Sequence, residues 1–179
     1  MRFIINLFGI LGILSTIIIY QQKENHRLLQ WKITTDLLWT VHYVANGNYS
    51  VVAVTLVAIM RSIILLLGEK YAWARQKWWL AVFIVCSLGF SVLAWKDWTS
   101  LLTLLSSLMC IVAYWIRIPR INRLISIPAA LLFLIHVGIN FSFWGFLSES
   151  FMLISAVVGF FRLDWPYYRE KFSEKRTAS

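Results

Sequence analysis

The chain has 179 residues, of which 60% are hydrophobic and only 14% are charged, and its mean hydropathy is +0.71. Soluble domains carry about 45–50% apolar residues, so this composition excludes an ordinary soluble domain and predicts an integral membrane protein. The formal net charge is +9. The basic residues are spread over several connections without a nucleic-acid-binding motif, which argues against a nucleic-acid partner.

Seven apolar segments recur along the chain, each close to the roughly 17–25 residues that cross a bilayer as a helix. They are residues 3 to 20, 30 to 46, 50 to 67, 78 to 94, 99 to 116, 124 to 140 and 144 to 161. The first follows Arg2 as in a signal peptide, but no small-residue cleavage site comes after it, and we interpret it as a helix. The connections are too short for a further domain, so we expect the function to lie in or at the membrane.

Basic residues alternate between successive connections, as the preference of Lys and Arg for cytoplasmic loops predicts. One side holds 14 of the 17, namely Lys23, Arg27, Lys32, Lys70, Arg75, Lys77, Arg117, Arg120, Arg123, Arg162, Arg169, Lys171, Lys175 and Arg176. The other side holds Arg2 and Lys96, and Arg61 falls inside a span. This segregation favours an odd number of helices with the N-terminus outside and the C-terminus in the cytoplasm, and a net charge that faces lipid headgroups.

An internal repeat is indicated by polar residues that recur with an offset of 94 residues in similar apolar surroundings. The offset pairs Tyr20 with Tyr114, His42 with His136, and Asn46 with Asn140. The first three spans and the last three are then copies, and the span 78 to 94 is an unpaired linker. An unpaired helix makes the two halves insert in the same direction, which places equivalent residues at equal depth.

The predicted fold is an all-α integral membrane protein with seven transmembrane helices, arranged as two parallel three-helix repeats joined by a linker helix (3+1+3). The first repeat covers residues 1–76, the linker helix 77–97 and the second repeat 98–163. A charged cytoplasmic tail follows at 164–179, and we expect its last residues to be disordered.

The histidine pair is the centre of the candidate solute site. Each histidine lies about one helical turn (5.4 Å) inside the outer end of its span, and ionisable residues in spans usually face the bundle interior or water. We predict a substrate-binding cavity lined by His42, His136, Asn46, Asn140 and Trp39. Three alternatives remain open: the histidines bond only a neighbouring helix, the asparagines cap helix ends, and the tryptophan is a packed or lipid-facing aromatic.

Further charges within the spans need partners. Asp36 and Arg61 lie at similar depth on neighbouring spans, so we predict an ion pair between them, acting either as a structural pair or as a cytoplasmic gate. We also predict a hydrogen bond between His136 and Glu149, which would raise the affinity of the imidazole for a proton and allow proton coupling if water reaches it.

Enzyme chemistry is not indicated. The sequence holds no nucleophile and base set, no metal-ligand constellation and no cofactor motif, and we expect neither a metal nor a cofactor. Cys86 and Cys110 lie within apolar spans, where a thiol behaves as a small hydrophobic group.

The chain resembles the YgjV-type bacterial inner-membrane proteins over nearly its whole length. The resemblance rests on the segment from Gln21 to Arg27, on His42 followed by Gly47, Tyr49 and Arg61, and on His136 followed by Glu149 and Arg162. It implies a multi-pass protein of the bacterial inner membrane and leaves the substrate open. A looser resemblance is to the SWEET and PQ-loop transporters, which share two three-helix bundles around a linker helix, although the Pro-Gln dipeptide is absent here.

Two functional hypotheses follow. The first is a carrier or facilitator for a small neutral or zwitterionic solute, an expectation that rests partly on the analogy of fold. The second is a non-transporting structural or partner-binding membrane protein, whose polar residues only hold the helices together. A cavity that contains both histidines would favour the first hypothesis, and dry packing there would favour the second. The sequence leaves open whether two copies form a homodimer.

Overall fold

The computed structural model describes residues 2–47, 49–93, 95, 97–140 and 143–169. Within them the chain is all helical, with seven α-helices, one short 3-10 helix and one π-helix. Their bounds are α1 (Arg2–Ile19), α2 (Asn25–Ala45), α3 (Tyr49–Leu67), η1 (Trp73–Arg75), α4 (Trp78–Leu93), α5 (Ser100–Trp115), α6 (Pro119–Ile139), α7 (Phe143–Gly159) and η2 (Phe160–Asp164). Lys96 and the tail from residue 170, including its expected disorder, lie outside the described residues.

Each of the seven predicted spans corresponds to one α-helix. α2 and α6 start five residues before the spans predicted from position 30 and position 124, because polar first turns extend both helices beyond their apolar parts. Pro119 is tolerated at the start of α6, since the first helical N–H has no partner within the helix. The two helices are equal in length at 21 residues, and α6 begins and ends 94 positions after α2.

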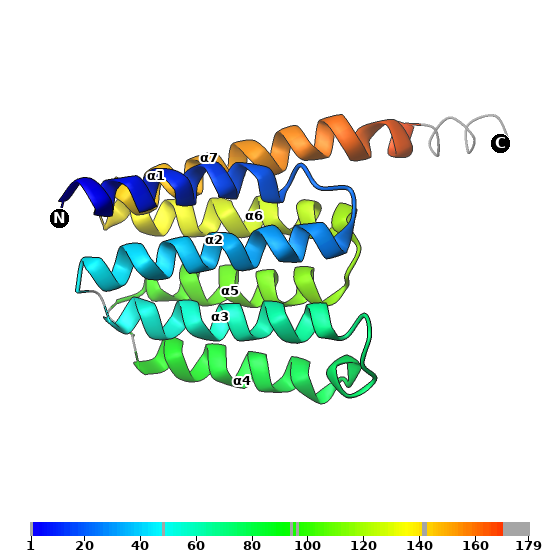
Figure 1. Ribbon diagram of the computed structural model, residues 1–179, viewed down its shortest axis with the longest axis horizontal. Helices are drawn as coiled ribbons and strands as arrows, with labels where there is room; N and C mark the ends of the chain where they lie inside the picture. Colours follow the sequence, from blue (N-terminus) through cyan, green and yellow to red (C-terminus); the bar gives the residue numbers. More distant parts are fainter. Residues whose placement is uncertain (1, 48, 94, 96, 141–142, 170–179) are drawn as a thin grey trace, which may run out of the picture.

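Successive helices run in opposite directions and are joined by short connections (Figure 1). α2 packs between α1 and α3, and α6 packs between α5 and α7. α1 also packs along α7, and α4 packs along α5. The central core therefore draws on helices from both ends of the chain: its buried members are Ile19, Tyr20, Leu28, Leu29, Leu65, Tyr114 and Ala156.

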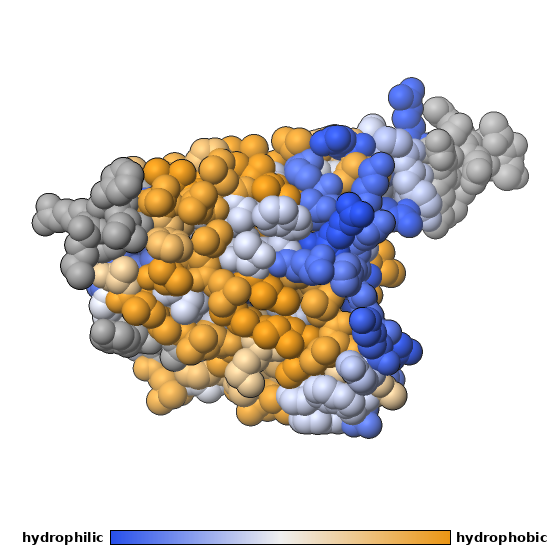
Figure 2. All heavy atoms as spheres, viewed as in Figure 1, coloured by the Kyte–Doolittle hydropathy of each residue, from blue (hydrophilic) through white to orange (hydrophobic). Residues whose placement is uncertain are grey.

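The surface has the polarity expected of a membrane protein. In the face shown by Figure 2, apolar side chains cover the flank of the helices, and hydrophilic ones gather at the end that holds the α1–α2, α3–α4 and α5–α6 connections. Val85, Leu93 and Phe143 expose 66, 84 and 72% of their surface, which is stable only against lipid or another apolar partner. We call the hydrophilic end the basic end.

Two helical segments of the described chain are long and apolar enough to cross a membrane by length and composition alone. These are Pro119–Ile139 and Gly145–Arg169. Four further helices are apolar but shorter: Asn6–Ile19, Val54–Leu67, Trp78–Leu93 and Ser100–Trp115.

Arg123 lies at the basic end but is buried inside the protein. Arg123 is only 2% exposed, and it donates from Nε and Nη2 to the two carboxylate oxygens of Asp164, each at 2.7 Å. Its Nη1 donates to the carbonyl oxygens of Tyr20 and Gln22. Asp164, which the sequence placed at the start of the tail, is instead fully buried, and helical turns continue through Arg169. The pair joins α1, α6 and η2 at the basic end.

Candidate functional site

His42 is buried among aromatic rings of its own helix. Its ring meets that of Trp39 edge-on, with centroids 5.3 Å apart at an interplanar angle of 84°, and it lies 5.6 Å from the ring of Tyr43. His42 is 3% exposed and lines neither of the two cavities described below.

His136 binds the connection that precedes α5. Its Nδ1 lies 3.1 Å from both the carbonyl and the hydroxyl oxygen of Thr99, and with a proton on Nδ1 it donates to them. The hydroxyl and the N–H of Thr99 donate to Asp97, at 2.5 and 2.8 Å, and these hydrogen bonds hold the pKa of Asp97 below its ordinary value. The predicted His136–Glu149 hydrogen bond is wrong, because α6 turns His136 toward α5 while Glu149 faces a cavity beside α1 and α2.

The two asparagines are helix caps. Asn46 and Asn140 occupy the C-cap positions of α2 and α6, and the Nδ2 of each donates at 2.9 Å to the carbonyl oxygen of the histidine four residues earlier. Gly47, directly after the first cap, takes a left-handed φ of 73° that glycine adopts without strain. The capping interpretation is therefore confirmed.

Trp39 is a packed aromatic. It is 7% exposed and lies so close to α1 that a Cβ on Gly12 would be 3.0 Å from its Cε2 atom. This confirms the packing alternative, and the ring also forms part of the wall of a small cavity.

The small cavity has a volume of about 110 Å³ and lies between α1, α2, α5 and α7. Its polar lining is Thr16, Tyr20, Lys32, Thr35, Asp36, Tyr114, Ser148 and Glu149. Lys32 forms an ion pair with Asp36 one turn away on α2. Asp36 and Arg61 both lie in the described part of the chain, and no ion pair joins them. The predicted Asp36–Arg61 pair is therefore wrong. Asp36 lines the small cavity together with residues of α1, α5 and α7. One carboxylate oxygen of Glu149 is buried without a hydrogen-bond partner among the described residues.

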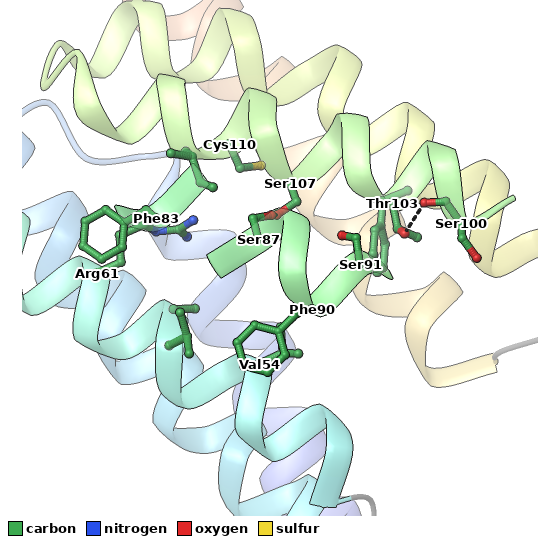
Figure 3. A pocket seen from close by; sticks show the side chains of 14 residues that line it. Val54, Arg61, Phe83, Ser87, Phe90, Ser91, Ser100, Thr103, Ser107 and Cys110 are labelled. Carbon is green, nitrogen blue, oxygen red and sulfur yellow. Dashed lines mark hydrogen bonds between the residues drawn. The ribbon is translucent and has the colours of Figure 1, made fainter. Parts of the chain in front are cut away.

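The large cavity has a volume of about 300 Å³ and lies between α3, α4 and α5, with Phe133 of α6 at its wall. Five hydroxyl side chains line it: Ser87, Ser91, Ser100, Thr103 and Ser107 (Figure 3). Ser87 and Ser107 lie 2.8 Å apart across the α4–α5 contact, and Thr103 donates to the carbonyl oxygen of Ser100 at 2.8 Å. This cavity was not predicted, although its signal is visible in the sequence as hydroxyl residues at helical spacing in two otherwise apolar spans.

Toward the basic end the large cavity is closed by apolar packing. Ile64 of α3, Ala74 of η1, Phe83 of α4 and Ile111 of α5 form one buried cluster, and Phe83 and Ile111 also line the cavity. Arg61 lies one turn before Ile64 on α3, so its guanidinium sits at the inner end of the cavity beside this cluster. We call these four residues the apolar floor.

Arg61 enters the large cavity without an acidic partner. Its Cζ lies 5.5 Å from the centre of the Tyr114 ring, and its Nε is buried with no hydrogen-bond acceptor among the described residues. Tyr114 in turn packs with Tyr20 in the central core. Asp36 and Glu149 line the small cavity while Arg61 lines the large one, so the two residues of the predicted Asp36–Arg61 gate belong to different cavities.

The arrangement of apolar helices around these cavities agrees with the comparison with known families. The family model Imp-YgjV, described as a bacterial inner membrane protein, matches residues 3–165. The chain belongs to this family. It matches no curated protein sequence and no solved structure. The protein is therefore an all-helical protein of the bacterial inner membrane.

In this Imp-YgjV member, the residues that carried the sequence resemblance do not meet at one site. Arg61 lines the large cavity and Glu149 the small one, whereas His42 and His136 line neither. Across the described part of the chain, no group of three or more His, Cys, Asp or Glu side chains is arranged to hold a metal ion. The large cavity, with its hydroxyl groups and one guanidinium, is the candidate functional site.

Proposed function

We propose that this inner membrane protein is a carrier for a small polar solute, which binds in the large cavity between α3, α4 and α5. The observation that supports this is a cavity of about 300 Å³ with five hydroxyl groups and one guanidinium in an otherwise apolar helix bundle. Polar groups at membrane depth are costly and usually face water or a substrate pathway, and ligand pockets begin at about this volume. The hydroxyl groups suit a solute that forms hydrogen bonds, and the guanidinium suits a negative group on it.

The carrier is built, in this proposal, from two parallel three-helix repeats, α1–α3 and α5–α7, with α4 as the linker. The bounds of α2 and α6 support it, since both ends differ by 94 residues. The cavity linings support it further. Positions 94 residues apart occupy the walls of the two cavities, as in the pairs Thr16 and Cys110, Trp39 and Phe133, Ser148 and Val54, and Met152 and Ala58.

Tyr20 and Tyr114, which the offset also pairs, belong to the same buried cluster in the centre of the bundle. Equivalent residues of two parallel repeats meet only near the axis that relates them. The tyrosine pair, which also lines the small cavity, thus marks the proposed axis.

The basic end faces the cytoplasm in this proposal, in keeping with the preference of basic loops for that side. The apolar floor then separates the solute site from the cytoplasm. Transport requires the floor to open, and a carrier of two parallel halves opens it by moving one half against the other while the opposite end closes.

The test is uptake of a mixture of isotopically labelled polar metabolites into proteoliposomes that contain the full chain. Ser107→Phe fills the cavity, and Val85→Phe adds the same side chain on α4 where Val85 is 66% exposed, so it serves as the matched control. We expect at least one solute to enter with the native chain and the Val85 variant, and uptake to fall at least about tenfold with the Ser107 variant.

The alternative is the non-transporting structural or partner-binding protein, which is favoured by the position of both histidines outside the two cavities. It is supported if empty liposomes and liposomes with native protein take up every solute equally. Equal uptake by the native chain and the Ser107→Phe variant would instead show that transport occurs elsewhere than in the large cavity.

A further inference from the structure

Arg61 is the only charged side chain among the described residues that line the large cavity. Its Nε–H finds no acceptor, and the ring of Tyr114 faces the guanidinium carbon without accepting a hydrogen bond from Nε. Asp36, the acid at comparable depth on α2, is already paired with Lys32. The buried Nε–H is unfavourable without an acceptor, because it has lost water without gaining a hydrogen bond.

The geometry around Arg61 indicates which chemical group would bind its guanidinium. A guanidinium presents Nε–H and one Nη–H side by side, which matches the two oxygens of a carboxylate. Cys110 lines the same end of the cavity, together with Phe83 of the apolar floor (Figure 3). The anion of a ligand would therefore sit at the inner end of the cavity, against an apolar wall.

The hydroxyl groups extend from this point toward the opposite end of the bundle. On α5, Thr103 and Ser107 lie on the same face as Cys110, and on α4, Ser87 and Ser91 lie one turn apart. At a rise of about 1.5 Å per residue, the nearest of these hydroxyl groups lie within roughly 5–10 Å of the Arg61 level. Hydroxyl oxygens accept hydrogen bonds from an ammonium or a hydroxyl group.

We propose that the large cavity recognises a small monocarboxylate, an α-amino or α-hydroxy acid, whose carboxylate binds Nε and Nη of Arg61 and whose ammonium or hydroxyl group binds the serine and threonine hydroxyls. This inference rests on the proposed carrier function and names the class of its solute. One guanidinium balances one carboxylate, and the cavity volume of about 300 Å³ suits a molecule of this size.

The probes are two matched pairs, lactate with lactamide and alanine with alaninamide, in which each amide lacks the carboxylate. Uptake is measured in phosphatidylcholine proteoliposomes with the native chain, Arg61→Gln and Arg61→Lys. The control is Arg27→Gln, because Arg27 lies exposed at the same end of the protein in an ion pair with Glu24. We expect the native chain and the control to prefer the acids to the amides by about tenfold to a hundredfold.

Arg61→Gln is expected to take up less acid and the same amount of amide, so the preference for the acid is lost. Arg61→Lys is expected to retain part of the preference, since lysine keeps the positive charge but lacks the two parallel N–H donors of the guanidinium. Equal uptake of acid and amide by the native chain overturns the inference while the carrier function stands. Loss of acid and amide uptake to the same extent in Arg61→Gln also overturns it, because Arg61 would then serve the cavity as a whole.

A second measurement detects binding of the acid without requiring transport. Cys110 lines the cavity beside Arg61, and in a Cys86→Ser background it is the one thiol of the chain. Lactate or alanine at saturating concentration should slow the reaction of Cys110 with a small thiol reagent in the native chain and not in Arg61→Gln. If no solute is transported but the acids still protect Cys110, the carrier proposal fails and the carboxylate site remains.

Anionic lipid is the other source of a negative group, and phosphatidylglycerol vesicles test it. Protection of Cys110 by phosphatidylglycerol alone, with no further effect of lactate or alanine, would identify a lipid headgroup as the occupant and overturn the inference. Equal protection in both lipids, dependent on the acid, supports it.

Discussion

The α1/α7 contact and the space between α3 and α5 are equivalent places in the proposed repeat, yet the first is tightly packed and the second holds the large cavity. On α7, Ser155 and Gly159 face α1. The hydroxyl of Ser155 donates to the carbonyl oxygen of Ile17 at 2.5 Å, and a Cβ on Gly159 would lie 2.4 Å from the carbonyl oxygen of Tyr20. Small residues spaced four apart allow the backbones of membrane helices to approach in this way.

At the positions 94 residues earlier, α3 carries Arg61 and Leu65 in place of Ser155 and Gly159. Leu65 fills the central core, and Arg61 projects into the cavity. Two larger side chains thus stand where close contact requires small ones. In the proposed repeat, these two larger side chains accompany the change from a packing face on α7 to a cavity wall on α3.

Two arginines, the buried Arg123 and the partly buried Arg61, differ in the same sense. Arg123 fixes the α1/α7 side, because it bonds Asp164 after α7 and two carbonyl groups at the end of α1. Arg61 on the cavity side bonds no acid. One arginine therefore joins distant segments of the protein, and the other is the one that the proposed solute would bind.

The largest effect is expected for Arg123→Met. The substitution leaves the buried carboxylate of Asp164 without its partner, and breaking a buried pair in this way costs about 3–5 kcal/mol. The free energy of unfolding, followed by tryptophan fluorescence in detergent, should fall by that amount, and the double variant Arg123→Met with Asp164→Leu should recover part of it. Arg27→Met at an exposed pair is the control; an equal loss there would contradict the comparison.

Gly159→Ala is expected to have the next largest effect. Its methyl group would overlap the carbonyl oxygen of Tyr20 and approach Cδ of Arg123 to 3.0 Å, so α1 and α7 must separate. Overpacking of this kind costs about 1–3 kcal/mol. The matched control is Gly89→Ala on α4, where the added Cβ meets nothing within 4 Å and should be neutral or stabilising. A neutral Gly159→Ala would mean that α1 and α7 are not held closely together.

Ser155→Ala should cost about 0.5–1.5 kcal/mol in the free energy of unfolding, because it removes a hydrogen bond between α7 and α1 and a contact with Gln21. Ser62→Ala on α3 is the control. Ser62 is also buried, but its hydroxyl bonds only the carbonyl oxygen of Ala58 within its own helix. Equal losses from the two variants would show that the inter-helix hydrogen bond adds nothing.

Arg61→Met should have the smallest effect on stability. Because no acid is left unpaired, the free energy of unfolding in the absence of solute should stay within about 1 kcal/mol of the native value or rise. A loss as large as that of Arg123→Met would reveal a structural partner for Arg61 and remove the distinction between the two arginines. The measurement is the same denaturant titration, with both variants compared in one detergent.

The sequence by itself determined the helices and their polarity. Each of the seven apolar segments became one α-helix, and basic connections gathered at one end of the bundle (Figure 2). The caps at Asn46 and Asn140 could also be predicted, because a capping side chain bonds to its own helix and depends only on nearby residues. The offset that paired the two tyrosines pointed to residues that belong to one buried cluster, whereas the histidines paired by the same offset have different surroundings.

Only the tertiary structure decided which faces of the helices meet. Asp36 lies toward Lys32 and the small cavity instead of Arg61, His136 meets Thr99 instead of Glu149, and Asp164 is buried against Arg123. The hydroxyl stripes of α4 and α5 became a cavity wall because these two helices turn them toward α3. In a sequence that is apolar all round its helices, hydropathy is nearly the same on every side. The rotation of each helix about its axis therefore depends on close packing and hydrogen bonds between distant segments, which local sequence patterns do not encode.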